Sequence, residues 1–150
     1  MGFRHVVLGL DGSPHSRRAA AFLQRLGPRG GRVTVVRVIE PVRAPAMPFV
    51  PSGMRAQIAG QAEVVNRGQT AAAQRLVDSV ARALTRAGWR ARGIVRAGVP
   101  LAELLATVRA ERADALVLGA RGAGAVSHFL LGSVAEKALR QSPVDVLIVK

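Results

Sequence analysis

Short apolar runs alternate with segments of helical spacing along the whole chain. Between the runs, apolar residues recur at i, i+3, i+4 and i+7, as in the segment Ala19–Leu26, which is the spacing of a helix with one buried face. Such alternation predicts right-handed βαβ units and a mostly parallel sheet. We therefore predict an α/β fold, a single doubly wound five-stranded parallel sheet of strand order 3-2-1-4-5 with helices on both faces. The strands are predicted at residues 3–10, 32–39, 89–96, 114–118 and 144–149.

Proline, glycine and serine residues mark the limits of the helices. Ser13 and Pro14 predict the N-cap and first residue of the first helix, which Gly27 ends. The start of the second helix stays open between residues 55 and 61, because two glycines disfavour its first turns; it ends at 87. Further helices are predicted after Pro100 and from 133 to about 140. The proline-rich segment 40–54 predicts an irregular loop over the carboxyl edge of the sheet.

Length, composition and charge narrow the class of protein. The 150 residues predict one domain, and no apolar run approaches the roughly 20 residues of a membrane span. The absence of cysteine and of a signal-peptide pattern favours a cytoplasmic protein. The net charge of +13 suggests nucleic-acid binding, but the arginines are spread over every segment and only 3% of residues are aromatic. We expect no specific nucleic acid partner, only weak, salt-sensitive association with polyanions.

A glycine-rich segment, Gly119–Ser133, joins the fourth strand to the last helix. Glycines let a backbone approach a phosphate closely, and the N-terminus of a helix favours negative charge. Gly119, Gly122, Gly132 and Ser133 form the pattern G-x2-G-x9-G-S, which is not the Walker pattern. The alternative is a loop that needs glycine only for turning, with Ser133 and Glu136 forming a capping box.

The predicted strand order points to the same place. The chain changes direction across the sheet between strands one and four, and ligands bind outside the carboxyl ends of the strands at such a point. Those two strands end at Leu10–Asp11 and Leu118–Gly119. Topology and glycine spacing therefore predict one ligand crevice.

The glycine pattern resembles the ATP-binding signature of the universal stress protein family. The resemblance covers nearly the whole chain: VVLGLDGSPHS near the start, the Gly98-x-Pro100 turn, and ADALVLGARGAG through LLGSVAEKALRQSPVDVLIVK. It implies a small cytoplasmic protein of the stress response that binds ATP, with Mg²⁺ held mainly by the phosphates. It also implies a homodimer through strand Val144–Val149, with Val146 and Ile148 at or near the contact; the alternative is a monomer whose strand edge is covered by a loop, such as the proline-rich segment 40–54.

The resemblance also assigns roles to single residues. Asp11 would bind the ribose hydroxyls, although an aspartate there can also form an Asx-turn or helix cap. The backbone of Val38 would hold the adenine edge. Arg121 would pair with a phosphate, the alternative being an exposed loop arginine. The remaining phosphate contacts would come from Gly119, Gly122, Gly132, Ser133 and Val134.

Nothing in the chain resembles a dedicated catalytic site. No Ser/His/Asp arrangement is identifiable, and His5, His15 and His128 have no metal-ligand spacing. An ATP-binding regulatory protein with at most slow hydrolysis is the leading hypothesis. The alternatives are a dimeric interaction module of the same fold that binds no nucleotide and, less favoured, a basic nucleic-acid-associated protein.

Overall fold

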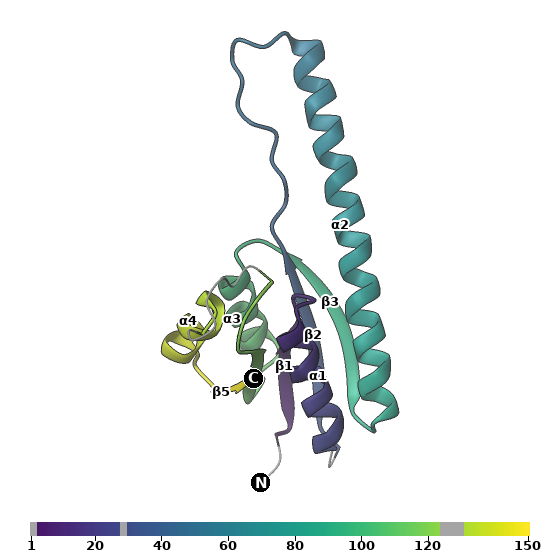
Figure 1. Cartoon of the computed structure of the whole chain (residues 1–150), viewed down its shortest axis with the longest axis vertical. Helices are drawn as coiled ribbons and strands as arrows, with labels where there is room; N and C mark the ends of the chain where they lie inside the picture. Colours follow the sequence, from purple (N-terminus) through teal and green to yellow (C-terminus); the bar gives the residue numbers. More distant parts are fainter. Residues whose placement is uncertain (1–2, 28–29, 124–130) are drawn as a thin grey trace.

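A computed structural model describes residues 3–27, 30–123 and 131–150. Its sheet has the order β3-β2-β1-β4-β5 with every neighbouring pair parallel, which confirms the predicted fold class, strand order and edge position of the third strand (Figure 1). In chain order the elements are β1 (His5–Gly9), α1 (Pro14–Leu26), β2 (Arg32–Ile39), α2 (Ser52–Arg86), β3 (Arg90–Ala97), α3 (Pro100–Ala110), β4 (Ala115–Gly119), α4 (Ser133–Gln141) and β5 (Asp145–Val149).

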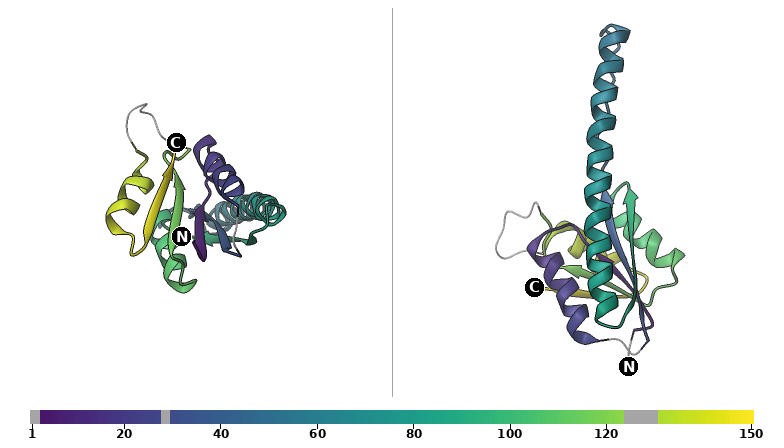
Figure 2. Two further views of the ribbon diagram at one scale, coloured as in Figure 1. Left: turned by 90° about the horizontal axis from the view of Figure 1, so that it is seen from below. Right: turned by 90° about the vertical axis from the view of Figure 1, so that its right-hand side faces the viewer.

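Two hydrophobic cores lie on the two faces of the sheet. Successive side chains of a strand point to opposite faces, so Val6 and Leu8 of β1 pack with α1 and α2, whereas Val7 packs with α3 and α4. Figure 2 shows the two helix pairs on either side of the sheet. None of the described helices is both long and apolar enough to cross a membrane.

The second helix is much longer than the sheet that it covers. Its buried residues, Ala73, Val77, Ala81 and Leu84, belong to its C-terminal part. Residues 52–70 extend beyond the sheet with segment 41–51 running alongside them (Figure 1). No residue between 41 and 70 is buried. We call residues 41–70 the arm.

The arm corrects two predictions. The proline-rich segment does not lie over the carboxyl edge of the sheet, because it continues outward from β2 and is held to α2. The Val42 N–H donates to Asn66 Oδ1 at 2.8 Å, and Asn66 Nδ2 donates to the Val42 carbonyl at 2.9 Å. The helix begins at Ser52, before both predicted starts, directly after Pro51 at the N-cap. Gly60 and Gly68 weaken this part of the helix but do not interrupt it.

Candidate functional site

A cleft of about 1020 Å³ opens at the carboxyl end of the sheet, where β1 and β4 end side by side. The loops after these two strands, the start of α4, the end of β2 and the middle of α2 line it. All eight residues predicted for the ligand crevice line this one cleft: Asp11, Val38, Gly119, Arg121, Gly122, Gly132, Ser133 and Val134. The structure therefore brings together residues that lie up to 123 positions apart in the sequence.

Asp11 joins the two strand-end loops. One carboxylate oxygen accepts the Ser13 N–H at 2.9 Å, which is the predicted Asx-turn, and the other accepts the Ala123 N–H at 3.0 Å. Burial raises the pKa of the carboxyl, but hydrogen bonds, chiefly from Ser13, outweigh burial and hold the pKa below its usual 3.8. Asp11 is therefore ionised at neutral pH. A carboxylate offers about four acceptor positions, so two amides leave room for further donors.

Ser13 and Ser16 form a second link between the loops. Ser13 Oγ accepts the Ser16 N–H at 3.2 Å, which confirms Ser13 as the N-cap of α1. The same hydroxyl donates to the Arg121 carbonyl at 3.2 Å. The cap signal in the sequence identified Ser13 as a helix start but could not show that it also positions the glycine loop.

A side chain at any of the three motif glycines would come into close contact with neighbouring atoms. A Cβ on Gly119 would lie 2.5 Å from the His15 carbonyl carbon at the start of α1. A Cβ on Gly122 would lie 2.9 Å from Asp11 Oδ2, and one on Gly132 would lie 3.2 Å from the Gly122 nitrogen. Gly132 has φ −63° and ψ 151°, which any residue adopts. Lack of space against the backbone of α1 therefore explains Gly119, whereas a side chain at Gly122 would displace the Asp11 carboxylate and one at Gly132 would press on the loop backbone.

The start of α4 differs from the predicted capping box. The N-cap is Gly132, with no side-chain cap, and Ser133 is the first helical residue. Glu136 pairs with Arg140 at 2.9 Å and does not reach back to the N-cap, so the capping-box prediction is wrong.

The first amides of α4 have no hydrogen-bond partner within the helix. The Gly132 N–H donates to the Ala120 carbonyl at 2.8 Å, and the first helical hydrogen bond comes from Glu136 to Gly132. The amides of Ser133, Val134 and Ala135 therefore precede the helical hydrogen bonds, and all three residues line the cleft. Three adjacent N–H groups at the positive end of a helix favour an anion.

β2 extends beyond the end of β1, and Val38 lies in this extension. Pairing of β1 with β2 ends at Gly9↔Val36, and the Leu10 N–H still donates to the Val36 carbonyl at 2.8 Å. Because strand residues alternate in direction, the N–H and C=O of Val38 point to the same side as those of Val36. No described residue of β1 reaches them there, so they face the cleft.

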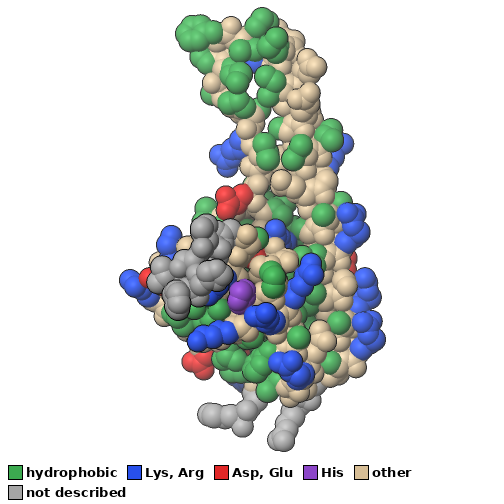
Figure 3. All heavy atoms as spheres, viewed as in Figure 1, with side chains coloured by type: hydrophobic (Ala, Val, Ile, Leu, Met, Phe, Trp, Pro, Cys, Tyr) green, Lys and Arg blue, Asp and Glu red, His purple; other side chains and the backbone are tan. Residues whose placement is uncertain are grey.

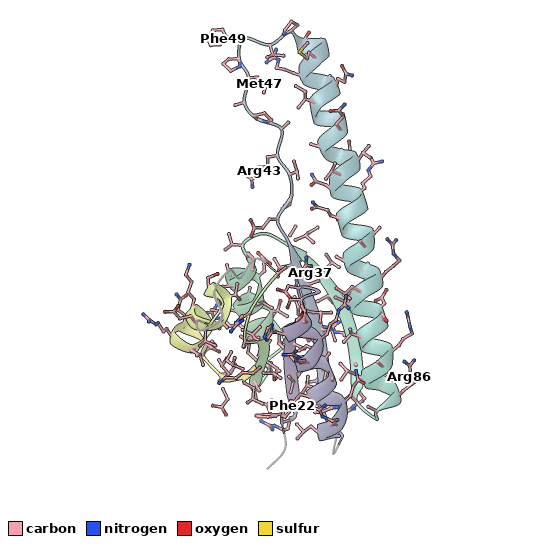
Figure 4. All side chains as sticks on the ribbon, viewed as in Figure 1. Phe22, Arg37, Arg43, Met47, Phe49 and Arg86 are labelled. Atoms are coloured by element: carbon pink, nitrogen blue, oxygen red, sulfur yellow. The ribbon has the colours of Figure 1, made fainter. Side chains whose placement is uncertain are left out.

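Further cleft residues escaped the sequence analysis. Arg37 and Glu40 flank Val38 at the end of β2, and Figure 4 labels Arg37. Arg37 lies near the carboxyl end of β2 and Glu40 directly follows the strand, and this position at the carboxyl end of a strand was a signal that could have identified them. Gln69 and Leu76 come from α2, and only the tertiary structure brings them to the cleft.

Arg121 is half-buried at the cleft, which excludes a fully exposed loop arginine. His128 lies outside the described residues. No three His, Cys, Asp or Glu side chains within 3–27, 30–123 and 131–150 are grouped so that they could hold a metal ion.

Comparison with known proteins identifies the family. The model of the universal stress protein family matches residues 2–150. The chain belongs to the universal stress protein family. A universal stress protein of Thermus aquaticus, encoded 3′ of a QAH/OAS sulfhydrylase, is 31% identical over 150 residues, covering 99% of each chain.

Solved universal stress protein structures share the fold. The structure of MJ0577, of Methanocaldococcus jannaschii, has a TM-score of 0.84 at 19% identity and covers 100% of this chain and 97% of its own. A universal stress protein in complex with cAMP has a TM-score of 0.65 at 23% identity and covers 99% of this chain and 98% of its own.

Proposed function

We propose that this universal stress protein binds an adenine nucleotide, ATP, in the cleft at the switch point of its sheet. We further propose that the bound nucleotide makes it a regulatory protein of the cytoplasmic stress response. One observation carries the proposal: three sets of groups that a nucleotide needs converge on one cleft. They are the main-chain groups of Val38, the ionised carboxylate of Asp11 and the first amides of α4. The related structure in complex with cAMP supports an adenine nucleotide as the ligand.

The base would lie at the end of β2. The N–H and C=O of Val38 offer one donor and one acceptor, which matches the edge of adenine, an amine beside a ring nitrogen. Leu76 and Ala73 of α2 provide an apolar wall nearby. Main-chain recognition of this kind does not depend on the side chain at position 38, so the strand-end geometry sets the specificity.

The sugar and phosphates would follow the cleft from Asp11 toward α4. The Asp11 carboxylate can accept both ribose hydroxyls in addition to its two amides. The amides of Ser133, Val134 and Ala135 would bind phosphate oxygens, with Arg121 beside them. Mg²⁺ would be held mainly by the phosphates and water, as this ion usually is.

The cleft favours binding over rapid turnover. Asp11 is a poor general base, because its pKa lies below 3.8 and both of its oxygens already accept amides. We therefore expect at most slow hydrolysis of ATP.

The direct test is to identify what the purified protein carries. Heat denaturation followed by mass spectrometry should release an adenine nucleotide, and calorimetry on the stripped protein should show ATP binding. GTP is the matched control, because guanine reverses the donor and acceptor at the edge that Val38 would read. Absence of released nucleotide together with no heat of binding would favour a nucleotide-free interaction module.

We also propose a homodimer through β5. Within the described residues, β5 pairs with β4 along one edge, and its other edge lies at the end of the sheet. Unpaired strand edges promote association, and closed two-fold symmetry is the commonest way to satisfy them. Val146→Pro removes a backbone donor and should convert a dimer to a monomer in light scattering. A wild-type protein that is monomeric at micromolar concentration would contradict this dimer but not the nucleotide site.

A further inference from the structure

The arm exposes apolar side chains at its tip. Phe49 is 99% exposed, Met54 is 55% exposed and Met47 is 37% exposed. Figure 4 shows Phe49 at the apex of the arm, pointing away from α2, and Figure 3 shows hydrophobic side chains gathered there. No residue from 44 to 54, the segment that we call the tip, is charged. A clustered apolar surface on a protein of this charge marks an interaction site.

The arm lacks the packing that would stabilise it within one chain. Residues 52–70 contain no buried residue, although a helix in a protein gains most of its stability by burying one face. Gly60 and Gly68 each make this helix less stable by about 1 kcal/mol relative to alanine, because both lie in its interior. A contact from outside the chain would supply the missing burial.

An apolar groove lies beside Phe49. It has a volume of about 480 Å³ and runs between segment 44–48 and the first turns of α2, lined there by Arg55, Ile58 and Ala59. An apolar cavity of roughly 150 Å³ is enough to hold benzene, so the groove can take a phenyl ring. The chain's own Phe49 does not fill it.

We propose that the tip binds the tip of a second copy of this chain, with Phe49 of each copy inserted into the groove of the other. Phe49, which we call the knob, and the groove lie on the same tip. A second copy of the chain therefore supplies a groove for the knob and a knob for the groove. The tip contact taken by itself is then two-fold and joins two copies. Arg55 at the edge of the groove would lie against the inserted ring as a cation–π partner.

The charge distribution favours this occupant. Two chains of net charge +13 repel one another if their basic surfaces meet. Residues 52–70 extend by about 28 Å at 1.5 Å per residue. This distance exceeds three Debye lengths of about 8 Å at physiological salt. The uncharged segment 44–54 at the end of each long arm therefore lets two copies meet with only Arg55 of each as a charged group at the contact, while their basic bodies stay apart.

The test compares three variants by sedimentation velocity. Protein concentrations of roughly 1 to 200 μM cover the dissociation constants of a weak self-association. Phe49→Glu removes the knob and Ala59→Trp fills the groove without adding charge. Leu26→Glu is the matched control, because Leu26 is a half-exposed leucine at the end of α1, outside the arm. Both tip variants should weaken one association step at least tenfold and remove the largest species. Leu26→Glu should match the wild type.

The outcome is separate from the other two proposals. The contact uses neither β5 nor the cleft, so Phe49→Glu should leave ATP binding unchanged, and Phe49→Trp should retain association. Identical sedimentation of wild type and Phe49→Glu at every concentration would overturn the proposal. An equal loss in Leu26→Glu would do so too, because it would show non-specific apolar association.

Discussion

The two parts of α2 form one continuous helix but differ in what holds them. The C-terminal part buries Val77 and Leu84 completely against the sheet. The part in the arm contains no fully buried residue, contains three glycines and exposes Val64 by 69%. Its half-buried residues are Ile58, Ala62 and Asn66. Helical conformation along a chain therefore does not show that each turn contributes to the stability of the fold. The anchored part supports the cleft through Leu76, whereas the arm is free for contacts with other molecules.

The largest expected difference between the two parts of α2 is in how much a substitution lowers the stability of the protein. Leu84→Ala should lower the free energy of unfolding by about 2–5 kcal/mol, because a fully buried leucine leaves a cavity. Val64→Ala in the arm should change it by no more than about 0.5 kcal/mol. Denaturant unfolding followed by far-UV circular dichroism measures both at a concentration where the protein does not associate. Similar losses in the two variants would mean that the arm is packed within its own chain.

Glycine substitutions in the cleft should affect ATP binding, whereas those in the arm should not. Gly122→Val should weaken ATP binding at least 100-fold, about 2.7 kcal/mol, because the side chain would displace the Asp11 carboxylate and also block the approach of a phosphate to the loop backbone. Gly132→Val should act in the same way through the Gly122 backbone. Gly60→Val is the control, since nothing lies within 4 Å of its added Cβ. Calorimetry should show wild-type ATP affinity for Gly60→Val; a loss there would show that the arm contributes to the nucleotide site.

Asp11 should have a smaller effect than the glycines. Asp11→Ala should weaken ATP binding by about 1–3 kcal/mol, the range for a lost hydrogen bond to a charged group. Wild-type protein should lose similar affinity for a 2′,3′-dideoxy nucleotide, and Asp11→Ala should not distinguish the two ligands. Equal binding of ATP and the dideoxy form by the wild type would restrict Asp11 to joining the two loops.

The smallest expected effect is a pH dependence of stability, and it arises in the part of the fold that packs around the sheet. His5 Nδ1 donates to the Glu111 carbonyl at 3.1 Å, and Nε2 lies 2.9 Å from Thr34 Oγ1. Burial, followed by the charge of Arg32, lowers the pKa of His5 below 6.5, against the opposing effect of Glu111 and Asp114.

The sign of the pH effect follows from this lowered pKa. The unfolded chain gains a proton at about pH 6.5, before the folded protein does, so the contribution of His5 to stability is present above that pH and decreases as the pH falls. Unfolding midpoints between pH 7.5 and 5 should decrease for wild type and for Val64→Ala. The decrease should be smaller for His5→Gln. An unchanged pH dependence in His5→Gln would assign the titration to other groups.

The sequence determined the repeating architecture and the place of the candidate site. Strand and helix periodicities are local, so residues a few positions apart were enough to predict β1–β5 and the βαβ order. Glycine spacing and strand order then converged on the cleft that Asp11 and Gly122 line. The prediction for Ser133 shows the limit of such local rules. A capping box fits the sequence, yet Ser133 is the first helical residue, as predicted, and the N-cap is Gly132, which packs on segment 120–122.

Only the tertiary structure decided which backbone groups face the cleft and where α2 leaves the sheet. Val38 is open because β1 ends opposite Val36, and Ser13 holds the carbonyl of Arg121, a residue 108 positions away. The arm departs from the predicted loop because Asn66 fixes Val42 across 24 residues of chain. Contacts of this kind depend on which distant segments the fold places together. No periodicity within a window of the sequence carries that information, because the hydrogen bonds form only after the sheet and its helices have packed.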